Sequence, residues 1–168
     1  MTNPESPQRV LPESDGRDAF DALVIRTDFS DDGQWQAVVR ELHLPWGDDG
    51  EFPASVRVVD DPAWSGATAD EVFAAVEEDE DLPVVFLADR RTMESPVRAL
   101  LALTTSWEDR SGLDPVYYQD LIDRPNPREF RAVPAAVHPV HTCVSLGNMG
   151  FAEFAATAAE SPGQVLPG

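Results

Sequence analysis

The stretch ALVIRTDFSDDGQWQAVVREL, residues 22–42, decides the fold of this 168-residue chain. It starts with an apolar run at residues 22–25 that contains β-branched side chains, which predicts a buried strand. A helix is expected immediately afterwards, with Ser30 as its cap. Apolar residues then recur at helical spacing and form one face, namely Trp35, Val38, Val39 and Leu42. The chain therefore opens with a strand followed by a helix.

The same unit recurs further along the chain. Residues 55–59 are predicted to form a second strand, and Thr68 with Glu71 has the capping-box spacing that marks the start of a short helix. Residues 82–88 are continuously apolar from Val84 onward, as expected for a central strand that is covered on both faces. This β-α-β-α-β order predicts a sheet whose first strands are parallel.

The second half of the sequence predicts a different connection. Residues 90–95 look like a polar turn, and it is too short to carry a parallel crossover, so residues 97–105 are expected to return as an antiparallel strand of a hairpin. Residues 130–133 and 143–146 are predicted as further strands, and Asn148 is expected to cap a closing C-terminal helix. The expected fold class is a single three-layer α/β domain with a mixed sheet.

Composition sets the expected domain boundaries. Residues 1–18 are rich in proline and acidic side chains, which predicts a disordered tail. The α/β domain is expected to span residues 19–161, with a loop insertion at residues 106–128 that is rich in glycine, proline and aspartate. Residues 162–168 are expected to be a flexible C-terminus.

The charge balance is strongly acidic. The chain has 31 acidic and 12 basic residues, a formal net charge of −19, and arginine as its only strongly basic side chain. The absence of lysine excludes Schiff-base and P-loop lysine chemistry. A surface this negative disfavours nucleic acid and anionic membranes and favours a cationic protein partner or a metal ion, although acidity can also serve solubility alone. The single cysteine, Cys143, and the lack of an apolar leader predict a cytoplasmic location.

Carboxylates follow each of the three strands that are expected to be parallel. Ligands bind outside the carboxyl ends of such strands, so these side chains are candidate ligand-binding residues. If these carboxylates lie close together, they repel one another unless Mg²⁺ or Ca²⁺ bridges them or arginine pairs with them. The alternative is that each aspartate only forms hydrogen bonds with nearby backbone, as many aspartates at strand ends do. The candidate ligand-binding residues are Asp28, Asp60, Asp61, Asp89, Arg26 and Arg90, of which Asp28, Asp60 and Asp89 are the candidate metal ligands.

A second group of possible metal ligands comprises His138, His141 and Cys143. The spacing matches no recognised zinc pattern, and Pro139 is expected to break the helix that would bring the histidines together, so hydrogen-bonded surface histidines and a buried thiol are the expectation. The glycines within residues 146–150 lack the spacing of a nucleotide-binding loop. Loop tryptophans could anchor a partner or fill a satellite core, namely Trp46, Trp64 and Trp107.

Three strings of the sequence carry a family resemblance. They are VIRTDFSDDGQW at residues 24–35, VVDDPAWSG at residues 58–66 and SLGNMGFAEF at residues 145–154. Together they resemble an uncharacterised bacterial domain-of-unknown-function family over about residues 21–159, with a longer 106–128 segment than the family pattern. The resemblance implies no activity, substrate or cofactor.

Two functions therefore remain open. The first is a non-enzymatic, acidic interaction module of the immunity or regulatory kind, which binds a cationic partner. The alternative is a small metal-dependent enzyme or ligand-binding domain that uses the aspartates at the carboxyl edge of the sheet. The charge favours the first, and only the positions of the strand-end aspartates favour the second.

Overall fold

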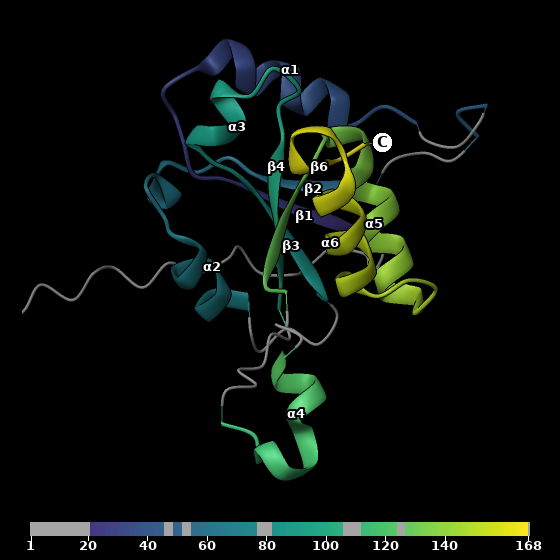
Figure 1. The fold of residues 1–168 in the computed structure, drawn as a ribbon. Coiled ribbons are helices and arrows are strands. Elements are labelled where there is room, and N and C mark those ends of the chain that lie inside the picture. Colours follow the sequence, from purple (N-terminus) through teal and green to yellow (C-terminus); the bar gives the residue numbers. More distant parts are fainter. Residues whose placement is uncertain are drawn as a thin grey trace, which may run out of the picture.

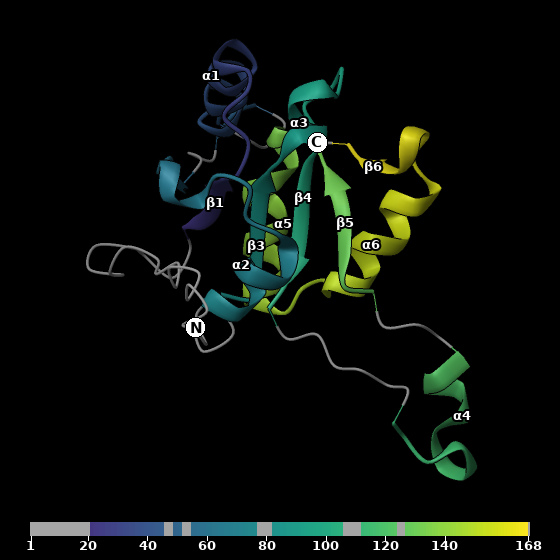
Figure 2. The same cartoon turned by 90° about the vertical axis from the view of Figure 1, so that its left-hand side faces the viewer.

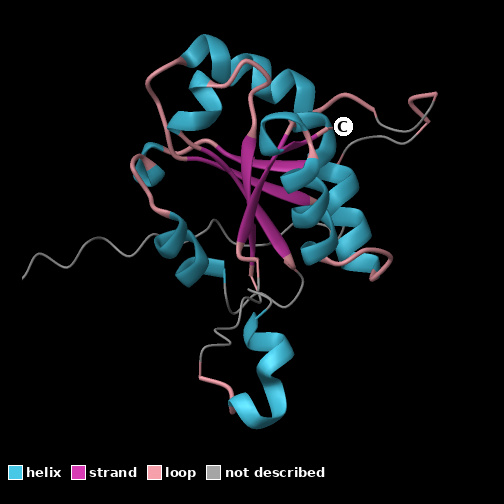
Figure 3. Ribbon diagram, viewed as in Figure 1, coloured by secondary structure: helices cyan, strands magenta, loops and turns pink. Residues whose placement is uncertain are grey.

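The computed structural model describes residues 21–45, 49–51, 55–76, 82–105, 112–123 and 127–167. These residues form one α/β domain around a six-stranded sheet with the order β2-β1-β3-β4-β5-β6 (Figures 1 and 3). The strands are β1 (Ala22–Arg26), β2 (Val56–Val59), β3 (Val84–Ala88), β4 (Leu100–Thr104), β5 (Glu129–Ala132) and β6 (Val165–Leu166). The helices are α1 (Asp32–Leu42), η1 (Pro62–Trp64), α2 (Ala69–Val76), α3 (Arg90–Glu94), α4 (Pro115–Asp123), α5 (Pro134–Leu146), α6 (Phe151–Glu160) and η2 (Pro162–Gln164).

The strand directions confirm the predicted mixed sheet. Strand β1 pairs in parallel with β2 and with β3, so that Val24 lies between Val58 and Phe86. Strand β4 is antiparallel to both β3 and β5, and β5 pairs in parallel with β6. The parallel start and the antiparallel return are therefore both as predicted.

Two apolar cores, one on each face of the sheet, make the domain three-layered (Figure 1). Alternating strand residues point to opposite faces, so Val24 belongs to one core and Ile25 to the other. Helices α1, α5 and α6 cover the first face, and η1 with α2 covers the second. None of the described helices has the length and apolar character needed to cross a bilayer.

The predicted turn at residues 90–95 is wrong, because residues 90–94 form α3. Asp89 caps this helix by accepting a hydrogen bond from the backbone N–H of Thr92, and the Thr92 hydroxyl accepts one from the backbone N–H of Asp89. The turn prediction failed because a five-residue helix shows little apolar periodicity. The cap of α1 also differs from expectation: Asp31 accepts from the backbone N–H of Gln34, in place of Ser30.

The predicted strand at residues 143–146 is also wrong, because this segment is the end of α5. The helix continues through Pro139, which removes one backbone hydrogen bond but leaves buried Val137 and Val140 on the sheet-facing side. Apolar packing thus outweighs the local cost of the proline. The next helix is capped at Gly150, not at Asn148, whose backbone N–H instead bonds to the Cys143 carbonyl.

The C-terminal segment, which the sequence predicted to be flexible, contains secondary structure in the fold. Residues 162–164 form η2, and β6 then adds to β5, with Leu166 only 6% exposed. The apolar pair Val165 and Leu166 supplies that edge strand, which is too short to be recognised from sequence. The predicted N-terminal tail lies outside the described residues, and α4 lies within the predicted insertion.

Two glycines are expected to respond in opposite directions to alanine substitution. Gly147 ends α5 with φ 75°, so Gly147→Ala should lower the free energy of unfolding by about 1 kcal/mol even though no atom lies within 4 Å of the new Cβ. Gly33 is the second residue of α1, where an added Cβ would lie in ordinary contact with Asp31 Oδ1 at 3.4 Å, so Gly33→Ala should raise it by about 0.5 kcal/mol. Urea titration followed by circular dichroism measures both; the same sign for both variants would contradict the assignment.

Candidate functional site

The carboxyl ends of β1 and β3 meet at the point where the chain order of the sheet reverses. From β1 the chain continues to β2 on one side and then to β3 on the other. Such switch points are the usual ligand crevices of α/β sheets. Here the segments that follow β1 and β3 are bonded to each other. The backbone N–H of Thr27 donates to the Ala88 carbonyl at 2.9 Å, and the Gln34 side chain donates to the Met93 carbonyl at 3.1 Å.

A buried arginine organises the edge next to this point. The Arg26 guanidinium donates to Asp32 Oδ1 at 2.6 Å and to Asp60 Oδ1 at 3.3 Å, with only 5% of its side chain exposed. It also lies over the rings of Phe29 and Trp35, at 4.3 Å and 5.1 Å from their centroids. Trp35 Nε1 completes the cluster by donating to Asp60 Oδ2 at 3.1 Å. These five residues, which we call the Arg26 cluster, tie the β1, β2 and α1 segments together.

Three other predicted site residues have local roles. Asp28 accepts from the backbone N–H of Ser30 at 2.7 Å, and Asp61 caps η1 by accepting from the N–H of Ala63 at 2.9 Å. Arg90 forms an exposed ion pair with Glu94 on its own helix, at 3.1 Å. The sequence argument that aspartates often end strands through local backbone bonds holds for Asp28 and Asp61.

Asp89 has a long-range partner, Arg131 of β5. The two terminal nitrogens of Arg131 donate to the two carboxylate oxygens of Asp89, each at 2.7 Å. The pair spans β4, which lies between β3 and β5, and the Thr92 hydroxyl and Arg131 both donate to the Ala99 carbonyl that precedes β4. A bidentate pair with so many fixed partners locks the α3 end of the sheet.

The pKa of Asp89 is lowered from its usual value. Burial by itself raises the pKa of the carboxyl, but the hydrogen bond and charge of Arg131, together with hydrogen bonds from the Thr92 backbone and hydroxyl, outweigh it. Asp89 is therefore ionised at neutral pH. It neutralises Arg131 in this low-polarity setting.

The carboxylates do not assemble into a metal site. Asp60 meets Arg26, Asp89 meets Arg131 and Asp28 bonds to backbone, so each of the candidate ligands has a different partner. Among the residues that the structure describes, no group of three or more histidine, cysteine, aspartate or glutamate side chains is placed to hold a metal ion. The arginine pairing that the sequence left as an alternative is what the structure shows for Asp60 and Asp89.

The histidines are not on the surface, contrary to expectation. His138 and His141 lie on α5, 9% and 0% exposed, because that helix continues past Pro139. Cys143 is half-buried on the same helix. Trp64 fills the core under α2, and Trp46 and Trp107 lie outside the described residues.

A cavity of about 430 Å³ lies beside the Asp89–Arg131 pair. We call it the α3–β6 cavity. A second hollow of about 270 Å³ shares Arg91, Arg131 and Gly163 with it. The walls of the α3–β6 cavity are Arg91, Glu94, Ser95, Pro96, Val97, Ala99, Arg131, Pro162, Gly163 and Val165.

Sequence reasoning missed Arg91 and Arg131. Arg131 alternates with Phe130 and Ala132, which point to the core under α6, so its side chain leaves the sheet on the other face. An arginine between two apolar residues of a strand was the available signal, since a largely buried charge needs a partner. Nothing in the sequence indicated that this partner is Asp89, 42 residues earlier.

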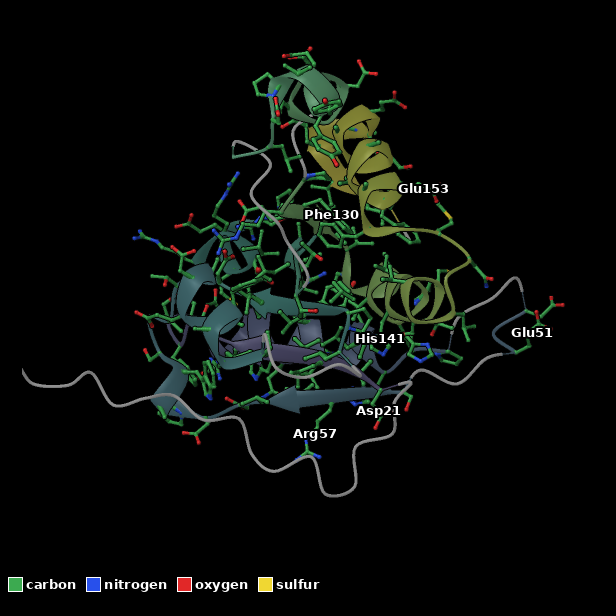
Figure 4. All side chains as sticks on the ribbon, turned by 90° about the horizontal axis from the view of Figure 1, so that it is seen from below. Asp21, Glu51, Arg57, Phe130, His141 and Glu153 are labelled. Carbon is green, nitrogen blue, oxygen red and sulfur yellow. The ribbon has the colours of Figure 1, made fainter. Side chains whose placement is uncertain are left out.

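Another exposed feature is α4, which lies beyond the end of β4 and apart from the helical layers (Figure 2). It exposes three large side chains, namely Val116 at 82%, Tyr117 at 79% and Tyr118 at 46%. Residues 112–123 contain three aspartates and no basic residue. Acidic side chains elsewhere also point outward, as Figure 4 shows for Glu51 and Glu153.

Comparison with known proteins identifies the family but no activity. No curated protein matches the chain. A family model described as "Domain of unknown function (DUF6924)" matches residues 21–165, which is the whole sheet as far as the first residue of β6. The predicted resemblance to a family of unknown function is thereby confirmed. This α/β chain belongs to the DUF6924 family.

Proposed function

We propose that this protein is a non-enzymatic, cytosolic interaction module whose helix α4 binds a cationic protein segment. The observation that carries the proposal is the combination on α4 of exposed aromatic and apolar side chains with the three aspartates of residues 112–123, a range that contains no basic residue. Tyrosine is enriched among the residues that dominate binding energy at protein interfaces. Its ring can also stack on an arginine of the partner.

The charge distribution of the rest of the molecule supports a cationic partner. Several arginines are already engaged by the protein's own carboxylates: Arg98 pairs with Glu41 at 3.3 Å, and Arg128 pairs with Asp70. With Arg26 and Arg131 also paired, much of the limited positive charge is neutralised internally. The remaining acidic surplus attracts a basic partner and accelerates its association at low salt.

The shape of α4 suits a protruding contact. The helix is kinked at Tyr118, where φ is −125° and ψ is 22°, so it consists of two short turns. Asp114 caps the first turn by accepting from the backbone N–H of Val116 at 2.9 Å, and Asp123 accepts from the Gln119 side chain at 2.7 Å. Asp120 has its carboxylate exposed between these turns.

The experiment uses a 12-residue peptide that alternates arginine and leucine, with affinity measured by fluorescence anisotropy. The double variant Val116→Ser/Tyr117→Ala is expected to weaken binding at least tenfold, because it removes both exposed anchors. Leu44→Ser is the matched control, since Leu44 is 59% exposed but lies just beyond α1. It should change the affinity less than twofold.

The role of the α4 charge is tested with two double variants, each of which removes two negative charges. Asp120→Asn/Asp123→Asn on α4 is expected to weaken binding about five- to tenfold at low salt, and Glu51→Gln/Glu160→Gln elsewhere is expected to have a much smaller effect. Equal losses from the two pairs would show that only net charge matters and would contradict the α4 site. Affinity that does not change between 20 mM and 300 mM salt would contradict a cationic partner.

A further inference from the structure

The α3–β6 cavity combines a largely apolar wall with a cation, Arg91, that forms no ion pair with the described carboxylates. Its volume of about 430 Å³ lies within the range of about 300–1,000 Å³ that is usual for small-molecule sites. It opens at the carboxyl edge of the sheet, whereas α4 lies between the end of β4 and the start of β5 at the opposite edge. A ligand bound here would therefore be independent of the proposed partner of α4.

The two arginines that line the cavity differ in their partners. Arg131 gives both terminal nitrogens to Asp89, which neutralises its charge and holds it as part of the wall. Arg91 is exposed on α3 and forms no ion pair with any carboxylate among the described residues. The neighbouring Arg90 takes the carboxylate of Glu94. Arg91 therefore remains available to an anionic group in the cavity.

Ser95 supplies a second donor beside Arg91. Its hydroxyl oxygen accepts hydrogen bonds from the backbone N–H groups of Val97 and Ala99, at 3.3 Å and 3.2 Å. With the oxygen occupied as an acceptor, its own hydrogen is free to donate. A carboxylate of a ligand can thus accept hydrogen bonds from the guanidinium of Arg91 in α3 and from the hydroxyl of Ser95, which follows the last residue of α3.

Apart from Glu94 and the paired Arg131, the rest of the wall is apolar or glycine. Pro96, Pro162 and Val165 line it, and Val97 leaves 46% of its side chain exposed beside the opening. An apolar chain or ring of a ligand would cover this surface and remove it from water. The cavity therefore suits a ligand with one anionic end and an apolar body.

Backbone conformation marks the same place. Within the described residues, Arg98 with φ 54° and Gln164 with φ 58° are the non-glycine residues with positive φ. Arg98 lies between the lining residues Val97 and Ala99, and Gln164 lies directly before Val165. Such backbone strain concentrates at functional sites, where the surrounding structure maintains it.

We propose that the α3–β6 cavity binds a small monocarboxylate with an apolar body, held at its carboxylate by Arg91 and Ser95. A single negative charge is favoured over the double charge of a phosphate monoester, because the net charge of −19 repels each further charge and Glu94 also lines the site. The ligand class is thus an aliphatic or aromatic carboxylic acid.

The test titrates the full chain with octanoate, octanamide and octyl phosphate, by calorimetry and by ¹H–¹⁵N chemical shifts. Octanoate is expected to bind saturably, with shifts confined to residues 91–99, 130–132 and 162–166, which line the cavity or adjoin its lining. Octanamide should bind at least tenfold more weakly, because it lacks the charge. Octyl phosphate should also bind more weakly, and equal or tighter binding of it would overturn the monocarboxylate assignment.

Two arginines at opposite ends of the sheet order provide matched variants. Arg91→Gln is expected to weaken octanoate binding at least tenfold, and Arg57→Gln, which removes the same charge from β2, far from β5 and β6, should change it less than twofold. A thermal melt of each variant confirms folding. Equal effects of the two variants, shifts elsewhere in the molecule, or no saturable binding by any of the three probes would overturn the proposal.

Discussion

Replacing Trp35 with alanine is expected to lower the free energy of unfolding by about 4 kcal/mol. The side chain is 1% exposed and packs in the core between α1 and the sheet. Its removal also withdraws the Nε1 donor from Asp60 and one of the two aromatic rings beside Arg26. Urea denaturation followed by far-ultraviolet circular dichroism measures the loss.

Trp35→Phe separates packing from hydrogen bonding. Phenylalanine keeps most of the apolar contact but has no N–H for Asp60, so the expected loss is about 1–2 kcal/mol. If Trp35→Ala were no more destabilising than Trp35→Phe, the Arg26 cluster would not depend on the buried ring. The structure would then misassign what holds β1, β2 and α1 together.

Asp89→Ala is expected to cost about 3 kcal/mol at pH 7. The substitution leaves Arg131, whose side chain is 16% exposed, without its carboxylate partner, and it removes the cap of α3. Asp61→Ala is the matched control, because Asp61 also caps a helix after a strand but forms no ion pair with the residues that the structure describes, so its loss should be about 1 kcal/mol. Equal losses from the two variants would contradict a stabilising role for the Arg131 pair.

Asp89 also predicts how stability depends on pH. Its pKa in the folded protein is lower than in the unfolded chain, so the unfolded state takes up the proton first as pH falls. The contribution of Asp89 is therefore complete above the unfolded pKa of about 4 and is lost as pH falls through the folded pKa. Asp89→Asn, which keeps an acceptor for the cap, should lose stability at pH 7 and show a flatter decline below about pH 4 than the parent protein.

Unfolding midpoints measured at half-unit steps from pH 2.5 to pH 7 test this difference. The parent and Asp89→Asn curves should approach each other toward the acid end, because protonation of the unfolded parent chain removes the stability that the carboxylate contributes. Curves that stay parallel throughout would show that Asp89 titrates alike in the folded and unfolded states. That result would contradict the depressed pKa.

The elements with strong periodicity were predictable. Continuous apolar runs predicted β1 and β3, and the spacing of Trp35, Val38 and Leu42 predicted α1. The elements that were missed are those whose stability comes from distant contacts. Strand β6 exists because β5 offers it an edge, and α5 continues through Pro139 because its apolar residues pack on the sheet.

The candidate site divides in the same way. That Asp60 and Asp89 lie at the carboxyl edge followed from the order of strands and helices, and the structure adds that Asp60 pairs with Arg26. The order of strands and helices did not indicate which arginine neutralises Asp89. Arg90 is adjacent in sequence, but its ion pair is with Glu94 on the same helix, one turn further along.

The sequence by itself determined the acidity, the absence of lysine chemistry, the parallel β-α-β-α-β start and the carboxylates at its strand ends. Only the tertiary structure decided that Asp60 and Asp89 pair with arginines while Asp28 and Asp61 bond to backbone, and that Arg91 lines a largely apolar cavity. The physical reason is the distance along the sequence over which each effect acts. Periodicity and capping act within a few residues, whereas the partner of a buried charge is set by which strands the sheet places side by side.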